Sequence, residues 1–297
     1  MIRSSVSVIR LFCTLFPLRL AESRPPESES RNIQRKSVQK GMKKVYVTEL
    51  TGKGGDQAAL HMSIEQQYEV VDETPDGYIL DIQVNSIQKD KNTPQELSLS
   101  TTMMIMEGTH CQYVTDKNGK LLRSLSKDEV KEQYREKYFS IHEFVPNEND
   151  TIVREMAQKM KENESKNMQG VMNPLSLNGK DIVDGKEEEI DNLCAFKMKR
   201  TYHVNGDGSI QTHTALDMKP EEIREFFVKT FKQLGHGMGD EAKEDIEDLV
   251  RNFNMEYTED ATYTFLPDGW VRTIDCIVTT KESEHGTLSM TYRVYVK

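Results

Sequence analysis

Residues 60–84, LHMSIEQQYEVVDETPDGYILDIQV, contain two runs of alternating apolar and polar side chains on either side of a turn. Alternation with a period of two is typical of β-strands that bury one face and expose the other. The turn contains Pro75, Asp76 and Gly77, which are residues that favour a chain reversal between strands. We therefore expect the two runs to pair antiparallel as a hairpin.

The same pattern recurs along the rest of the chain. Further hairpin turns are expected at residues 116–119, 205–208 and 284–286, and the first two contain an Asn-Gly pair, which tolerates positive φ angles. Other strands are expected at residues 97–106, 255–266, 270–280 and 287–296. Together these segments predict about nine long strands, which suit a broad curved sheet.

Four segments show the helical period instead. They should begin at Ser126, Thr151, Pro220 and Asp240. Apolar side chains such as Phe227 and Phe231 would line one face of the third helix. The predicted fold class is therefore α+β: a curved, half-barrel-like antiparallel β-sheet of about nine long strands, with several amphipathic helices packed on it.

The composition divides the chain into a leader and a body. Residues 1–41 should form a leader that ends in a disordered linker, and residues 42–297 a single β-rich α+β domain. The polar stretch 163–192 would be a loop that joins two pseudo-halves, residues 42–162 and 193–297.

The leader permits three interpretations. Its basic start and the apolar stretch at residues 6–20 are typical of a secretory signal, while its Ser- and Arg-rich, acid-poor composition also fits an organelle transit peptide. A translation start near Met42 is the third. The apolar stretch is too short to span a bilayer as a transmembrane helix. We expect an extracytoplasmic protein, in the periplasm or associated with the envelope, and the alternative is a cytoplasmic protein that starts near Met42.

Charge and cysteine content exclude several function classes. Of the total charge of −10, residues 1–41 contribute +5 and the body −15, which argues against nucleic-acid binding. The four cysteines form no CxxC motif or zinc-like cluster. Cys194 and Cys276 lie on the same face of their predicted strands as the apolar side chains, so both should be buried thiols. The sequence leaves open whether they form a disulfide with each other.

No residues in the sequence suggest catalysis. The chain has no nucleophile-elbow, metalloprotease, phosphate-binding or dinucleotide-binding motif, so we expect no catalytic residues, no cofactor and no enzyme activity. His203 and His213 lie on the polar face of one hairpin, but no third ligand has suitable spacing, so no metal site is expected.

Three stretches resemble a known group of proteins: residues 60–84, GTHCQYVTDKNGKLLRSLSKDEV at 108–130, and YTFLPDGWVRTIDCIVT at 263–279. Their hairpins, with the polar helix after the second, resemble uncharacterised bacterial envelope (lipoprotein-like) proteins of unknown function. The same arrangement is similar to the half-barrel of lipoprotein-carrier proteins. The resemblance implies an extracytoplasmic protein with an apolar hollow between sheet and helices, and it implies no functional residues.

Two functions follow as hypotheses. The first is a non-enzymatic envelope protein that binds or carries a hydrophobic small molecule or lipid, because a curved sheet covered by helices can enclose an apolar site. The second is a structural or protein-interaction module of the cell envelope, with a solid core and an envelope protein as its partner. The ligand-binding residues are not predicted by the sequence.

Overall fold

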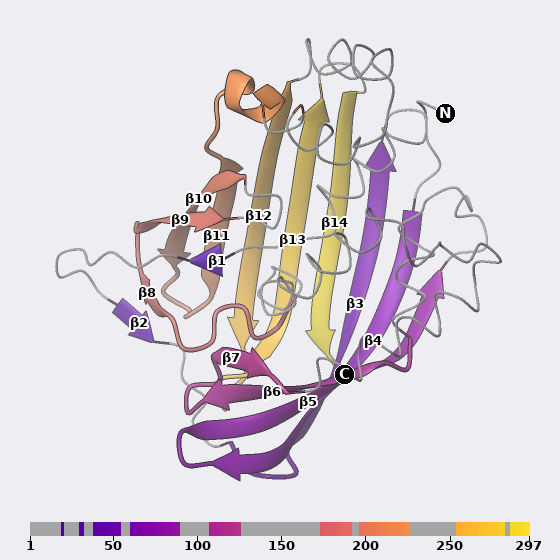
Figure 1. Cartoon of the computed structure of the whole chain (residues 1–297), viewed down its shortest axis with the longest axis vertical. Coiled ribbons are helices and arrows are strands. Elements are labelled where there is room, and N and C mark those ends of the chain that lie inside the picture. The colour runs from indigo at the N-terminus through magenta and orange to yellow at the C-terminus, as the bar shows by residue number, and fades with distance from the viewer. Residues whose placement is uncertain are drawn as a thin grey trace.

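The computed structural model describes residues 19–20, 30–32, 38–54, 60–89, 107–125, 173–191, 196–225, 228, 254–282 and 286–297. Figure 1 shows that most of these residues lie in one sheet. Its antiparallel strands follow the order β1-β9-β10-β11-β12-β13-β14-β3-β4-β5-β6-β7, and β2 and β8 form a separate pair. The strands are β1 (Arg19–Leu20), β2 (Ser30–Asn32), β3 (Lys43–Gly54), β4 (Leu60–Thr74), β5 (Gly77–Lys89), β6 (His110–Asp116), β7 (Leu121–Ser124), β8 (Asp181–Val183), β9 (Glu187–Asp191), β10 (Lys197–Val204), β11 (Ile210–Leu216), β12 (Met255–Phe265), β13 (Val271–Glu282) and β14 (Gly286–Val296).

The predicted α+β class is wrong. The described residues are nearly all sheet, and their helical part is one short segment at residues 220–225 and 228. The physical reason is that most of the buried apolar side chains alternate along strands, whereas in the described part of the helix Ile223 is the one that is buried. The helix expected at Pro220 does begin there. The helices expected from Ser126, Thr151 and Asp240, and the strand expected at residues 97–106, lie outside the described residues.

The predicted hairpins are confirmed. β4 pairs antiparallel with β5, β6 with β7, β10 with β11, and β13 with β14. Gly119, after the Asn118 of the first predicted Asn-Gly turn, has a φ of 80°. The sequence patterns did not predict β3, which pairs with β14 on one side and β4 on the other and so joins strands from both ends of the chain.

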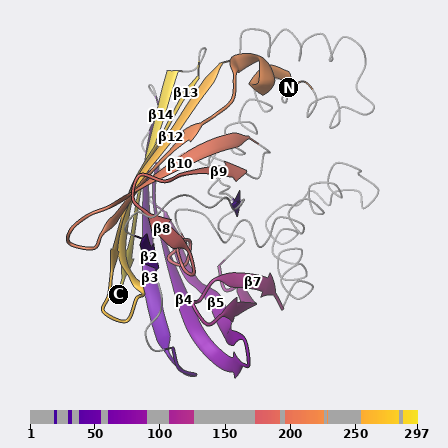
Figure 2. The same cartoon turned by 90° about the vertical axis from the view of Figure 1, so that its left-hand side faces the viewer.

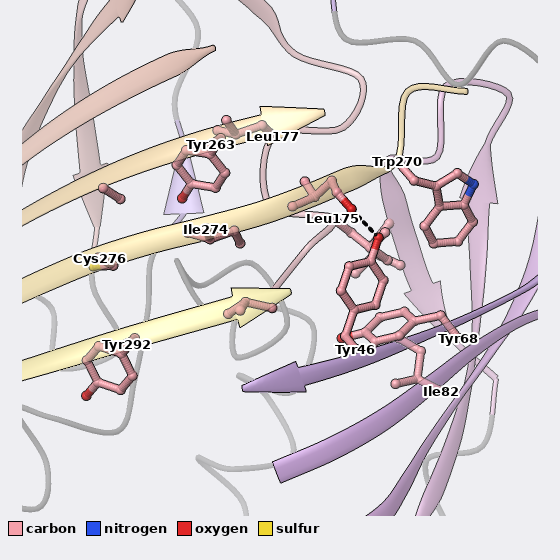
Figure 3. Packing of buried hydrophobic residues seen from close by; sticks show 14 of the residues in the cluster. Tyr46, Tyr68, Ile82, Leu175, Leu177, Tyr263, Trp270, Ile274, Cys276 and Tyr292 are labelled. Atoms are coloured by element: carbon pink, nitrogen blue, oxygen red, sulfur yellow. Dashed lines mark hydrogen bonds between the residues drawn. The ribbon is translucent and has the colours of Figure 1, made fainter. Parts of the chain in front are cut away.

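The sheet is curved (Figure 2). Its two faces differ in chemistry. Alternate side chains on one face, which we call the inner face, are buried, for example Tyr68, Leu80 and Val294. Most neighbouring side chains on the outer face are polar and at least partly exposed, and apolar Ile277 is exposed there as well. An aromatic group packs beside the turn between β12 and β13, where Tyr46 stacks on Trp270 at 6.5 Å and meets Tyr68 edge-on at 5.4 Å (Figure 3). This cluster forms a large part of the core.

Residues 173–180 form a turn that packs against the inner face. Leu175 and Leu177 are buried in the same hydrophobic cluster as Tyr263 and Trp270 (Figure 3). At its other end, a Cβ atom added to Gly179 would lie 2.7 Å from Cβ of Lys120, in the connection between β6 and β7. This segment, which we call the inner turn, therefore contacts strands that are far apart in the sheet order. It belongs to the stretch for which a polar loop was expected.

Candidate functional site

Four polar residues lie side by side on the inner face because of the strand register. Glu188 of β9 is opposite Arg200 of β10, Arg200 is opposite Thr214 of β11, and Thr214 is opposite Glu259 of β12. Arg200 reaches across the middle strand, so that its Nη2 donates to Oε1 of Glu259 at 2.8 Å and its Nε donates to Oγ1 of Thr214 at 2.8 Å. Arg200 and Glu259 are each only 1% exposed. The register thus places a buried ion pair, with polar neighbours, in a largely apolar face.

Tyrosines complete the hydrogen bonding of the two carboxylates. The hydroxyl of Tyr202 donates to Oε2 of Glu188, and that of Tyr257 donates to Oε2 of Glu259 at 3.3 Å. Burial raises the pKa of Tyr202 and of Tyr257, so both phenols stay protonated and act as donors. Burial is the largest single effect on the pKa of Arg200 and would lower it, but the Glu259 carboxylate, Tyr202 and Tyr263 together raise that pKa above its ordinary value.

Five buried polar atoms have no hydrogen-bond partner among the described residues: Asn173 Nδ2, Ser176 Oγ, Thr212 Oγ1, Tyr263 Oη and Thr280 Oγ1. Ser176 is close enough to Tyr263 to lower the pKa of that phenol, against the larger effect of burial, which raises it. The two hydroxyls do not reach hydrogen-bond geometry. Even if one of the two hydroxyls donated to the other, the hydroxyl proton of the accepting residue would still have no acceptor.

We define the inner polar cluster as this ion pair together with polar residues of the neighbouring strands and of the inner turn: Asn173, Ser176, Lys180, Glu188, Arg200, Tyr202, Thr212, Thr214, Glu259 and Tyr263. Its phenols are held in the neutral form, and the nearby thiol of Cys276 is buried, free and raised in pKa by burial. The cluster therefore offers hydrogen bonds and charge rather than an activated nucleophile.

Lys180 is the member of the cluster whose charge changes near neutral pH. Burial lowers its pKa from 10.5 to about 7, and repulsion from Arg200 adds to this effect, while Glu188 opposes it. Lys180 is half-buried, and no ion pair of its ammonium group is found within the described parts of the chain.

The folded protein should gain stability as the pH rises from about 7 toward 10.5. In this window the unfolded chain holds the Lys180 proton while the folded chain releases it, so the free energy of unfolding rises, by less than about 1.4 kcal/mol per pH unit. Urea unfolding of the wild type and of Lys180→Gln at about pH 7 and about pH 9 measures the effect as a difference. An equal pH dependence for the two proteins would contradict the assignment.

The histidines considered as metal ligands are on the outer face and each has an acidic partner. Nδ1 of His203 lies 2.8 Å from Asp184 Oδ1, and Nδ1 of His213 lies 2.7 Å from Asp260 Oδ1. In the described part of the chain, no three His, Cys, Asp or Glu side chains are grouped as metal ligands. Cys276 is a buried free thiol, as expected, whereas Cys194 lies outside the described residues.

Comparisons with known proteins show only a distant likeness. No protein-family model and no curated protein matches the sequence. A solved structure described as lipid–protein interactions in lipovitellin is similar with a TM-score of 0.39 and 9% identity, over 87% of this chain and 25% of that chain. A likeness this distant carries no argument about function, and the resemblance to bacterial envelope proteins stays a prediction. None of the described helical residues forms a helix long and apolar enough to cross a bilayer.

Proposed function

We propose that this protein is a non-enzymatic binding module that holds a hydrophobic ligand against the inner face of its curved sheet, in an extracytoplasmic compartment. The observation that carries the proposal is the contrast between the two faces of the sheet. The inner face is lined by apolar and aromatic side chains from β3 to β6 and from β9 to β14, and it also contains buried polar atoms that lack partners. Ligand sites combine these features: apolar walls and a few polar groups.

The ligand should be detectable on purified protein. Native mass spectrometry after mild delipidation is expected to show a bound hydrophobic molecule. Trp270, the only tryptophan in the sequence, is buried on the inner face and reports binding by its fluorescence. Absence of copurified ligand, together with no fluorescence response to added lipids, would contradict the proposal.

A second candidate is a structural or interaction module of the envelope with a solid core. It is favoured by the tight burial of inner-face residues, since Leu80, Ile274 and Val294 are 0% exposed. Its test is a pull-down from envelope extracts with the full chain. An enriched partner and no bound ligand would support this candidate over the first, and fractionation of cells would decide between the envelope and the cytoplasm.

A further inference from the structure

The inner polar cluster contains more hydrogen-bond donors than the chain uses. The carboxylates of Glu188 and Glu259 already accept bonds from Tyr202, Tyr257, Thr214 and Arg200. The hydroxyls of Ser176, Thr212 and Tyr263 and the amide Nδ2 of Asn173 are at least nine-tenths buried and have no partner in the described residues. Leaving a buried polar group unpaired costs about 1 to 3 kcal/mol. Several such groups together therefore need an explanation other than stability.

Three of the four charged groups that shift the pKa of Lys180 are positive. Arg200, Lys120 and Lys186 all act on Lys180 in the direction that lowers its pKa, and Glu188 is the acid that acts against them. Glu259, in contrast, is already bound to Arg200 at 2.8 Å. An additional negative charge beside Lys180 would be attracted, whereas an additional positive charge would be repelled.

Apolar side chains surround the same donors. Tyr263 lies opposite Ile210 on one side and Ile274 on the other, and Thr212 lies opposite Ala261. Leu177 of the inner turn belongs to the same hydrophobic cluster as Tyr263 (Figure 3). A molecule that reached these donors would therefore need an apolar body as well as an acceptor-rich end.

Building on the proposed hydrophobic-ligand function, we propose that the inner polar cluster binds the anionic head group of an amphiphile, with Lys180, Ser176 and Tyr263 as donors. The shared chemistry is a negatively charged oxygen group, either the carboxylate of a fatty acid or the phosphate of a lysophospholipid. The acyl chain would lie along the apolar part of the inner face. Arg200 and Glu259 position the site by fixing β12, which carries Tyr263, relative to β10.

The experiment compares ligands that share one acyl chain and differ in the head. Oleate, oleoyl lysophosphatidate and neutral oleyl alcohol are titrated into the full chain, with Trp270 fluorescence and native mass spectrometry as readouts. Both anionic probes, or one of them, should bind about tenfold more tightly than the alcohol. The stronger of the two identifies carboxylate or phosphate as the preferred head. Affinity for that probe should fall as the pH rises above about 7, because Lys180 loses its proton.

Two variants test the named donors. Lys180→Gln should remove the preference for the anionic probes and its pH dependence, while Lys199→Gln, on the outer face of β10 and paired with Asp217, should change neither. Tyr263→Phe should weaken binding of the anionic probe about tenfold and yet raise the urea midpoint of the ligand-free protein, because it removes an unpaired hydroxyl.

A matched control separates ligand contact from the general effect of removing a hydroxyl. Thr280→Val also removes an unpaired buried hydroxyl, but Thr280 lies opposite Tyr257, which is about 20 Å along β12 from Tyr263. It should raise the urea midpoint and leave binding unchanged. Equal affinity for all three probes in wild type and variants would overturn the head-group site while the hydrophobic-ligand function stands. No binding of any probe would overturn that function itself.

Discussion

Glu259→Leu is expected to lower the free energy of unfolding by about 3 to 5 kcal/mol. Arg200 and Glu259 are 1% exposed and joined at 2.8 Å, so loss of the carboxylate leaves a buried guanidinium without its counter-charge. Thr214 and Tyr257 lose their acceptor at the same time. Urea unfolding followed by the fluorescence of Trp270 measures the loss.

Two controls separate the ion pair from other effects. The double variant Arg200→Met/Glu259→Leu removes both charges and should recover most of the lost stability, because an apolar pair of similar volume needs no desolvation of charge. Glu256→Gln removes an acid from the outer face of the same strand, where Glu256 and Lys281 are 65% and 60% exposed, and should cost less than about 1 kcal/mol. A loss below about 1 kcal/mol for Glu259→Leu would show that water or another counter-charge reaches Arg200.

The same ion pair has a role in strand register. Arg200, Thr214 and Glu259 come from three neighbouring strands and are adjacent only in the observed pairing. If one of these strands slipped by one residue, its member of the group would move to the outer face. A slip of β10, for example, would move Arg200 outward and bring Lys199 inward. A buried pair that adds little net stability can thus still specify one arrangement of β10, β11 and β12.

The hairpins could be predicted because their signals are local. Alternation of side chains gives the buried face of a strand, and a turn with glycine gives its end, so the pairing of β4 with β5 or β10 with β11 follows from short stretches. β3 was missed because its own sequence, KKVYVTELTGKG, does not alternate cleanly: Val45 and Val47 put apolar side chains on the face opposite Tyr46. Its partners β14 and β4 include one from the other end of the chain, and such a pairing has no local signal.

The candidate site was missed for a different reason. Arg200 lies on the buried face of β10, between Met198 and Tyr202. A charged residue at such a position predicts a buried partner of opposite charge. The partner, Glu259, is separated from it by 59 positions, and only the sheet order brings the two strands close. The inner turn was assigned to a polar loop because residues 163–192 are rich in Asn, Gly, Lys and Glu and show little periodicity. The burial of Leu175 and Leu177 depends on contacts with distant strands.

Two turns of nearly identical sequence illustrate the limit of local patterns. Pro75-Asp76-Gly77-Tyr78 and Pro267-Asp268-Gly269-Trp270 both place an aromatic residue after Asp-Gly. Gly269 has a φ of 83°, which favours glycine, so its glycine is needed for backbone conformation. Gly77 begins β5 and pairs with Asp116 of β6, and its φ is not in the left-handed region. Its glycine is needed for the close approach of a neighbouring strand.

Gly77→Ala is accordingly expected to destabilise the protein by about 3 kcal/mol or more. A Cβ atom at this position would lie 2.0 Å from the carbonyl oxygen of Thr115 and 2.5 Å from the carbonyl carbon of Asp116. Both are backbone atoms, so a side-chain rotation cannot relieve the overlap, and β6 must move away from β5. Since β6 carries the connection that contacts Gly179, the inner turn should loosen as well.

Urea unfolding gives the size of this effect, and amide hydrogen exchange gives its location. We expect loss of protection in β6 and β7 and in the inner turn, with β12 to β14 retained. Gly206→Ala is the matched control, because a Cβ atom there meets nothing within 4 Å and its φ is not positive, so its stability should stay within about 0.5 kcal/mol of the wild type. If Gly77→Ala were as stable as Gly206→Ala, β5 and β6 would have to be farther apart than the structure places them, and the contact between the inner turn and the β6–β7 connection would lose its support.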